Sequence, residues 1–261
     1  MIITTGNHPV PDIVDRAEAL AKRLHSVYRP RGTFSLPKLA ERYRDDEILI
    51  VLQEAVRLYR KGMPIMEFHP SMGYVRAKRV LKGEMDPMIE AAGMMPGDSV
   101  LDCTAGLGTD SLLFAVYGGE GSRVTALESS LPLYALLLEG MVHYISGEPL
   151  VNDALRRIEV VHSDHLQYLK KQADNSVDIV YFDPMFRQPL NDSSAISPLR
   201  VFANGAALSP ESVSEAVRIA RKCVVLKEKA LSKEFERLGF HELLRNKSKI
   251  SYGVIQIDER S

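Results

Sequence analysis

Apolar and polar residues along the first part of the chain recur with periods that predict a small α/β module. Short apolar runs indicate strands, and apolar side chains at helical spacing indicate helices. Strands are predicted at 2–5, 47–53 and 63–68, a turn at 58–62 between the last two, and helices at 11–24 and, after the candidate N-cap Ser35, near Pro37. A module over residues 1–70 is near the lower size limit for independent stability, so we expect it to dock onto the rest of the chain.

The second part, residues 71–261, repeats a strand, a loop and a helix several times. A helical connector within residues 71–95 leads into it. Strands are predicted at 98–103, 122–127, 157–161, 177–182 and 222–227, helices near 109–117, 131–145, 165–172, 210–221 and 232–238, and a final strand pair at 241–245 and 251–257. This alternation predicts an α/β fold with a doubly wound, mostly parallel sheet whose last hairpin is antiparallel. Ligands of such sheets bind at the carboxyl ends of the strands.

Composition excludes several protein classes. The chain has 261 residues, 45% of them hydrophobic, which is enough for substantial cores. The N-terminus lacks a basic segment before an apolar stretch, and the apolar run at 131–142 is too short to span a membrane, so we expect a cytoplasmic protein. Cys103 and Cys223 form no Cys-x-x-Cys pair, and His162 and His165 lack a third partner, so we expect neither a disulfide nor a metal site.

Charge is unevenly distributed along the chain. Residues 1–82 contain 15 Lys and Arg against 9 Asp and Glu, a net charge of +6, whereas residues 83–261 contain 18 against 25, a net charge of −7; the sum is the −1 of the whole chain. The acidic part could hold a cation, and the basic part could lie against a polyanion. An ordinary solvated surface also explains a charge of +6 over this length, and the charge taken by itself favours that interpretation.

A glycine loop follows the predicted strand at 98–103. Residues 102–110 read DCTAGLGTD, with Gly106-x-Gly108 between a strand and a helix. Such a loop lets a ligand approach the backbone closely and points helix N–H groups at it. A dinucleotide-binding loop usually has Gly or Ala three positions later, where this chain has Ser111. Asp102 and Asp110 flank the loop, and two carboxylates favour a cationic ligand over a pyrophosphate.

Further acids follow the next two predicted strands. Glu128 stands where a carboxylate accepts both hydroxyls of a ribose, and Asp164 where it could accept from the amino group of adenine. Taken alone, Asp110 or Asp164 is more often a helix N-cap. Four acids at successive strand ends indicate a site for S-adenosylmethionine, an adenosine that carries a positively charged sulfur. The residues assigned to this cofactor are Asp102, Thr104, Ala105, Gly106, Gly108, Asp110, Glu128, Ser129, Ser163 and Asp164.

A second motif, YFDPMF at residues 181–186, ends the predicted strand at 177–182. Pro184 favours an extended Asp183 and removes one backbone donor, so the loop presents hydrogen-bond acceptors. We assign Asp183, Pro184 and Phe186 to catalysis, because acceptors can hold the hydrogens of a planar amine while the phenyl ring stacks on its base. Fixed acceptors favour the partly positive nitrogen of the transition state. The alternative is an Asp-Pro pair that only ends a strand.

These motifs resemble those of a known family. DCTAGLGTD, the acid in ALESS, and YFDPMF with the following LRVF segment are similar to the bacterial small-subunit ribosomal RNA guanine-N2 methyltransferases, within the class I S-adenosylmethionine-dependent methyltransferases. The resemblance runs roughly from Phe68 to Lys229 and implies a Rossmann-like methyltransferase sheet, a cofactor over the glycine loop, and a guanine at residues 183–186. Thr109 stands where family members tend to carry Arg, and residues 1–65 show no clear match.

The resemblance implies a partner, ribosomal RNA or the small ribosomal subunit. Arg76, Lys78 and Arg79 lie in a basic segment at 69–82 and are assigned to RNA phosphates. Met185, within the substrate motif, and Arg187, directly after it, are also assigned to binding of the substrate RNA. The polar stretch at 187–198 either orders around a target nucleotide turned out of its stack or is an ordinary surface loop. Other open interpretations are an amine in tRNA, DNA or a protein as the acceptor, and an RNA-assembly factor without turnover.

Overall fold

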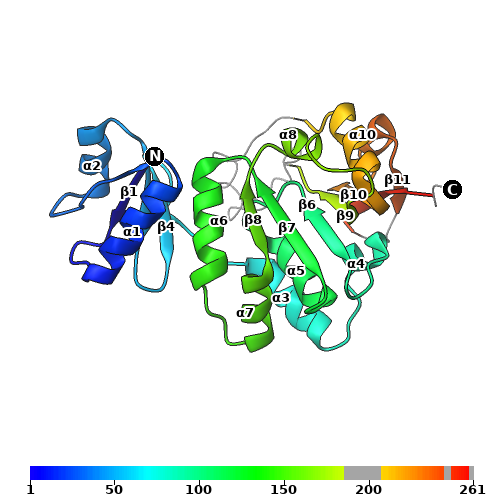
Figure 1. Ribbon diagram of the computed structural model, residues 1–261, viewed down its shortest axis with the longest axis horizontal. Helices are drawn as coiled ribbons and strands as arrows, with labels where there is room; N and C mark the ends of the chain where they lie inside the picture. The colour runs from blue at the N-terminus through cyan, green and yellow to red at the C-terminus, as the bar shows by residue number, and fades with distance from the viewer. Residues whose placement is uncertain (185–206, 244–247, 259–261) are drawn as a thin grey trace.

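The computed structural model of the chain describes residues 1–184, 207–243 and 248–258. It contains two sheets, one in an N-terminal module and one in a larger α/β domain that follows it (Figure 1). The module lies beside helix α6 of the larger domain, at the left of Figure 1. No helix among these residues has the length and apolar character needed to cross a membrane.

The N-terminal module is a five-stranded mixed sheet of order β2-β1-β3-β4-β5 with two helices. Its elements are β1 (Ile2–Thr5), α1 (Pro11–Arg23), β2 (Val27–Tyr28), α2 (Leu36–Tyr43), β3 (Glu47–Val51), β4 (Val56–Arg60) and β5 (Met66–Glu67). Side chains alternate between the two faces of a strand. Leu49 of β3 packs in one core with residues of α1, and Ile48 in another with residues of α2, so the two helices cover opposite faces of the sheet.

The predicted turn at 58–62 is wrong, because these residues belong mostly to β4. The tight connection lies earlier, where the N–H of Leu52 donates to the carbonyl of Ala55 at 2.9 Å. Leu58 is fully buried and pairs with Leu49 across an antiparallel ladder. Pairing with β3 and burial of alternate side chains therefore outweigh the turn-like composition that follows, and the predicted strand at 63–68 shortens to β5.

The seven-stranded sheet of the larger domain confirms the predicted fold class. Its order is β11-β12-β10-β9-β6-β7-β8. All neighbouring pairs from β10 to β8 are parallel, and β12 runs antiparallel to both β10 and β11. The strands are β6 (Ser99–Asp102), β7 (Arg123–Glu128), β8 (Glu159–His162), β9 (Val177–Phe182), β10 (Ala220–Lys229), β11 (His241–Leu243) and β12 (Ile250–Gln256).

Helices cover both faces of this sheet (Figure 1). One core contains buried residues of α3, α4, α5, α6 and α7, and a second core on the other face contains residues of α8, α10 and α11. The helices are α3 (Ser71–Leu81), α4 (Pro87–Ala92), α5 (Thr109–Gly118), α6 (Leu131–His143), α7 (Pro149–Arg157), α8 (His165–Leu169), α10 (Pro210–Ile219) and α11 (Lys233–Leu238). The helix α7 was not predicted, although Val151, Ala154 and Leu155 form its buried stripe.

The N-terminal module and α6 share a continuous core. An added Cβ at Gly140 would lie 2.0 Å from Cγ of Phe68, so only glycine lets the ring pack directly on the helix. Arg16 of α1 donates from Nε and Nη2 to Oε2 of Glu139 at 2.9 and 2.7 Å, which adds an ion pair across the same junction. The module is thus docked through both apolar and charged contacts, as the size of the module predicts.

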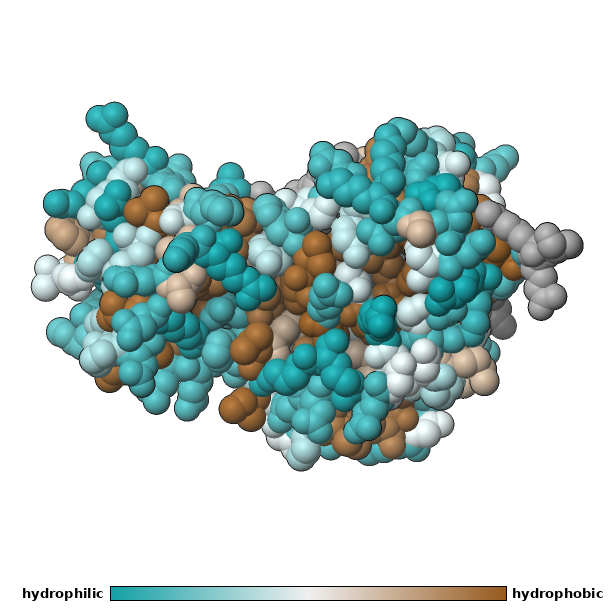
Figure 2. Space-filling model, viewed as in Figure 1, coloured by the Kyte–Doolittle hydropathy of each residue, from teal (hydrophilic) through white to brown (hydrophobic). Residues whose placement is uncertain are grey.

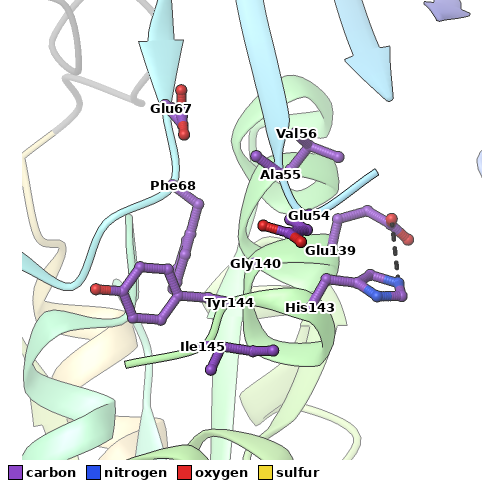
Figure 3. A pocket seen from close by; sticks show the side chains of 10 residues that line it. All are labelled: Glu54, Ala55, Val56, Glu67, Phe68, Glu139, Gly140, His143, Tyr144 and Ile145. Atoms are coloured by element: carbon purple, nitrogen blue, oxygen red, sulfur yellow. Dashed lines mark ion pairs between the residues drawn. The ribbon is translucent and has the colours of Figure 1, made fainter. Parts of the chain in front are cut away.

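A cleft of about 260 Å³ opens at this junction, between β4, β5 and the end of α6 (Figure 3). Phe68 and Tyr144 lie on one side of it, and Glu139 and His143, with Oε2 and Nε2 3.6 Å apart, lie on the other. Glu54 and Glu67 also line the cleft. None of the residues of the glycine loop lines this cleft.

Candidate active site

The glycine loop and the substrate motif meet at the carboxyl edge of the sheet. β6 lies between β7 and β9, so the residues that follow these three strands are spatial neighbours. The N–H of Cys103 donates to the carbonyl of Tyr181, and the N–H of Ala105 donates to that of Leu127. Thr104 joins the two motifs directly, because its hydroxyl accepts the backbone N–H of Asp183 at 2.6 Å.

The two glycines of the loop have different roles. Gly106 and Gly108 have φ angles of +55° and +70°, the left-handed region that glycine enters at low cost. Gly106 is partly exposed, whereas Gly108 is buried. An added Cβ at Gly108 would lie 2.2 Å from Cε of Met141, so this glycine also admits α6 against the loop. The backbone at Gly106 is therefore the part of the loop that is open to a ligand.

Asp102 ends β6 as a buried acid, only 1% exposed. Its Oδ2 accepts from the hydroxyl of Ser111 at 2.5 Å and its Oδ1 from the N–H of Thr104 at 3.1 Å. Burial raises the pKa of Asp102 to about 7, although both hydrogen bonds oppose the rise. Ser111, which weakens the dinucleotide interpretation at the sequence level, thus serves to hold this carboxylate.

Glu128 ends β7 and grips the loop from the other side. Its Oε2 accepts the N–H of Gly106 at 3.1 Å and its Oε1 the N–H of Ser130 at 2.7 Å. Burial raises the pKa of Glu128, and the N–H bonds oppose the rise. Each carboxylate oxygen keeps a second lone pair, so Glu128 retains acceptors for a pair of vicinal hydroxyls.

Asp164, Ser163 and Ser129 lie at the ends of the neighbouring strands. Asp164 is the N-cap of α8, where its Oδ1 accepts the N–H of Gln167 at 3.1 Å. The N–H of Ser163 donates to the carbonyl of Glu128 at 3.1 Å. All three are partly exposed, and they lie beside Glu128 along the edge of the sheet. Capping and ligand binding are compatible, because Oδ2 of Asp164 takes no part in the cap.

Asp183 follows β9 and is held at both its backbone and its side chain. Besides the bond to Thr104, its Oδ2 accepts from Nζ of Lys227 at 2.6 Å. Burial raises the pKa of Asp183, and the charge of Lys227 opposes the rise. The side chain remains 29% exposed, and the bond to Lys227 uses Oδ2 and not Oδ1. Pro184 is the last described residue of this segment, while Met185, Phe186, Arg187 and the stretch at 187–198 lie outside the described residues.

Lys227 is a site residue that the sequence did not reveal. It lies on β10 one position beyond Leu226, which pairs with Phe182, so the strand register brings it beside Asp183. Its Nζ also donates to Oδ2 of Asp110 at 2.7 Å. Burial would lower the pKa of this ammonium, but the two carboxylates outweigh burial and raise it. A lysine directly after a buried apolar run in a central strand was the only signal available in the sequence.

Asp110 lies behind the site in a network of ionic contacts. Its Oδ2 also accepts from the hydroxyl of Tyr181 at 2.7 Å, and its Oδ1 accepts from Nη1 of Arg76 at 2.5 Å. Burial alone would raise the pKa of Asp110, but the charges of Lys227 and Arg76 hold it below its ordinary value. Asp110 is 5% exposed and fully engaged, so its place is structural support for Lys227 and the loop.

Arg76 is engaged in the same network. Its Nε and Nη2 donate to Asp86 at 2.9 and 2.8 Å, in addition to the bond to Asp110. With 17% of its side chain exposed, its guanidinium is directed at these carboxylates and away from solvent. Lys78 and Arg79 on the same helix are exposed, as is Lys82 directly after it, so a phosphate can reach these members of the basic segment.

The site fits S-adenosylmethionine. Gly106 and the partly exposed Thr104, Ser129 and Asp164 form an open edge, and Asp102 and Glu128 place negative charge behind it. The ionic network has two cations, Arg76 and Lys227, against three carboxylates, those of Asp86, Asp110 and Asp183, so a negative charge remains for a cationic ligand. Among the described residues, no group of three or more His, Cys, Asp or Glu could hold a metal ion.

Comparisons with known proteins agree with this geometry. A family described as "Putative SAM-dependent methyltransferase" matches residues 35–249. The "Uncharacterized protein YpiP" of Bacillus subtilis (strain 168) is 39% identical over 255 residues, which cover 98% of this chain and 99% of that protein. The "Ribosomal RNA small subunit methyltransferase J" of Shewanella baltica (strain OS195) is 30% identical over 252 residues, which cover 92% of each chain.

Among solved structures, a SAM-dependent methyltransferase from Neisseria gonorrhoeae, NGO1261, superposes with a TM-score of 0.67. The alignment covers 100% of this chain and 98% of that one at 19% identity, so it shows a shared fold. The family match spans most of the chain and includes the glycine loop, the acids at the strand ends and Asp183. This chain therefore belongs to the family of SAM-dependent methyltransferases, enzymes that take S-adenosylmethionine as their cofactor.

Proposed function

We propose that the methyl acceptor is the exocyclic N2 amine of a guanine in small-subunit ribosomal RNA. The observation that carries the proposal is the geometry of Asp183. Its Oδ2 is held by Lys227 at 2.6 Å and its backbone by Thr104 at 2.6 Å, while the side chain is 29% exposed beside the glycine loop. A fixed acceptor at this position suits an amine hydrogen.

The chemistry requires an acceptor more than a strong base. The nitrogen of a guanine amine is a poor nucleophile because its lone pair is delocalised into the ring. Asp183, which accepts an amine hydrogen, favours the more pyramidal and partly positive nitrogen that develops as the nitrogen–carbon bond forms. The cofactor supplies the methyl group on a sulfonium, and the proton that the nitrogen sheds leaves through Asp183 or solvent. Lys227 keeps Asp183 in place and favours its ionised state.

The proposed cofactor residues lie along the carboxyl edge of the seven-stranded sheet, beside Asp183. Glu128 would hold the ribose hydroxyls with its remaining lone pairs, Asp164 the adenine amino group, and Asp102 would act through the charge it places under the loop. Thr104, Ala105, Gly106, Ser129 and Ser163 supply backbone and hydroxyl contacts around them. Gly108 and Asp110 support this edge from within the fold.

The choice of ribosomal RNA rests on relatives and on charge. The Shewanella baltica relative named ribosomal RNA small subunit methyltransferase J is similar to this chain over 92% of its length. Lys78 and Arg79 are exposed on α3, and the N-terminal end of this helix packs on the start of α5. Met185, Phe186 and Arg187 keep the substrate roles proposed for them from the sequence.

The test is transfer of a tritiated methyl group to small ribosomal subunits from a strain that lacks the gene, with tRNA and DNA as competing acceptors. We expect label only in the small-subunit RNA, at a guanine N2 that mass spectrometry maps. Asp183→Asn keeps the shape of the side chain and should retain cofactor binding while losing transfer. Label in tRNA, DNA or protein would show that the proposed acceptor is wrong. RNA binding without methyl transfer to any acceptor would instead favour an RNA-assembly factor without turnover.

A further inference from the structure

The end of the N-terminal module carries a dense cluster of arginines and aromatic rings. Residues 28–44 contain five Lys and Arg against one acid, Glu41. We define the arginine–aromatic surface by the basic and aromatic side chains of this segment, which come from β2, α2 and the loop between them: Tyr28, Arg29, Arg31, Phe34, Lys38, Arg42, Tyr43 and Arg44.

The aromatic rings order two of these arginines. The guanidinium of Arg29 lies over the ring of Tyr43, 4.8 Å from its centroid. Arg42 lies over the rings of Phe34 and Tyr43, at 5.1 and 5.8 Å. Both arginines are exposed while they contact these rings, so each side chain is held against an aromatic ring and is also accessible from solvent. Ring contacts thus pre-organise the arginines for an external partner.

The two stacked arginines are not neutralised by an ion pair within the part of the chain that the structure describes. Elsewhere in the module, Arg57 pairs with Glu67 at 2.7 Å and Arg60 with Glu47 at 3.6 Å. Among the described residues, neither Arg29 nor Arg42 forms an ion pair, and the nearby Asp45 is bound to the ammonium of Met1 at 2.8 Å. Clustered like charges repel one another, so a surface whose stacked arginines form no ion pair among the described residues is suited to a polyanion.

We infer that the arginine–aromatic surface binds unpaired segments of the substrate RNA. Guanidinium planes stack on exposed bases and their N–H groups reach phosphates, a combination that single-stranded RNA offers and a membrane surface does not. The inference rests on the proposed function, in which the substrate is RNA. In Figure 1, α2 lies on the same upper side as α8, where the carboxyl edge of the large sheet lies. Figure 2 shows a concave outline between the two lobes and a largely hydrophilic module, so an RNA could extend across both.

The test compares two double variants that remove equal charge from the same module. Arg29→Gln/Arg42→Gln removes the stacked arginines, and Lys22→Gln/Arg23→Gln removes two exposed basic residues at the end of α1 that contact no ring. Binding to small-subunit ribosomal RNA and to a short unpaired RNA is measured across a salt series. Losing two phosphate contacts should reduce the log–log salt slope by about 1.4 and weaken binding roughly 10- to 30-fold at about 0.1 M salt.

A third variant separates stacking from charge. Arg29→Lys/Arg42→Lys keeps both charges, and a several-fold loss on the unpaired RNA with no loss on a duplex of equal length is expected if bases stack on the guanidinium planes. Calorimetry with S-adenosylmethionine and the melting temperature show that each variant is folded. The inference is overturned if the Gln variant binds both RNAs as tightly as the Lys22/Arg23 control, or if the surface binds anionic phosphatidylglycerol vesicles and no RNA.

The same experiment distinguishes the two proposals. If the Gln variant binds RNA normally and the wild type methylates it, the inferred RNA-binding role of the surface is wrong and the proposed function stands. If the wild type binds RNA through these arginines but transfers no methyl group to it, the RNA-binding role of the surface is upheld and the proposed acceptor is wrong. At saturating RNA the Gln variant should keep the wild-type kcat, because the arginine–aromatic surface lies outside the catalytic edge.

Discussion

Replacing Lys227 by Met removes the one ammonium that Asp110 and Asp183 share. Its Nζ lies 2.7 Å from Oδ2 of Asp110 and 2.6 Å from Oδ2 of Asp183, and 18% of the side chain is exposed. Methionine keeps the length and apolar stem of lysine, so the substitution removes charge with little change in packing. Asp183 then loses its ion-pair partner, and Asp110 keeps only Arg76.

The expected cost follows from this burial. Leaving a buried charge without its partner costs about 3–5 kcal/mol of unfolding free energy. For a chain of this size, each 1 kcal/mol lowers the melting temperature by about 2–4 °C, so a drop of about 6–20 °C is expected. Because Lys227 and Arg76 hold the pKa of Asp110 below its ordinary value, this stabilisation is present at neutral pH and is lost as pH falls below about 4. The difference in unfolding free energy between the wild type and Lys227→Met should therefore become smaller as the pH falls below about 4.

Catalysis should suffer separately from stability. Without Lys227, Asp183 loses its anchor and the charge that opposes the rise of its pKa. A displaced acceptor costs about 10²-fold in kcat, which corresponds to roughly 2.7 kcal/mol of activation free energy. An ionised Asp183 is the stronger acceptor and offsets the positive charge that develops on the nitrogen, so the acid limb of the kcat profile should move to higher pH. Lys227→Arg should restore part of the activity.

The assay is a pH series of methyl transfer with saturating cofactor, alongside a melting curve. Lys222→Met is a matched control, because Lys222 lies on the same strand and pairs with a buried acid, Asp98, at 2.5 Å, but does so away from the catalytic edge. The control should keep kcat and its pH profile. Wild-type kcat with an unshifted acid limb in Lys227→Met would refute the role assigned to this lysine.

Three further predictions concern the cofactor edge and the docked module. Glu128→Ala should weaken S-adenosylmethionine binding by roughly 1–3 kcal/mol, since it removes a charged acceptor and frees the N–H of Gly106; calorimetry measures it, and unchanged affinity would take Glu128 out of the site. Because burial raises the pKa of Asp102 to about 7, cofactor affinity should increase as pH rises from 6 to 8, and Asp102→Asn should abolish that dependence. Gly140→Ala places a Cβ 2.0 Å from Cγ of Phe68 and should cost about 1–3 kcal/mol in chemical denaturation, whereas Gly147→Ala, with nothing within 4 Å, should be neutral; equal stability of the two would contradict the packing at the junction.

Much of the site could be predicted because its signals are local. A strand, a glycine loop and a helix can be recognised from about ten residues of sequence. Acids at successive strand ends become neighbours in any parallel sheet. The roles assigned to Asp183 and Gly106 stay predictions. The turn predicted at 58–62 failed because local composition competed with strand pairing, and pairing over the length of β4 prevailed.

Other features depend on contacts between residues far apart in sequence. Lys227 and Asp110 are separated by 117 positions, and only the register of β10 beside β9 brings the lysine between two carboxylates. The sequence predicts Arg76 as a phosphate ligand because it lies in the basic segment at 69–82. In the structure its guanidinium instead donates to Asp86 and Asp110.

The chain's linear pattern by itself determined the α/β alternation and predicted roles for the glycine loop and for YFDPMF, since each depends on residue types at short spacing. Only the tertiary structure decided which acids are buried and neutralised, why Gly108 must be a glycine, and where the module docks. The physical reason is that charges removed from water must find partners wherever packing places them, and packing joins elements that the sequence keeps apart.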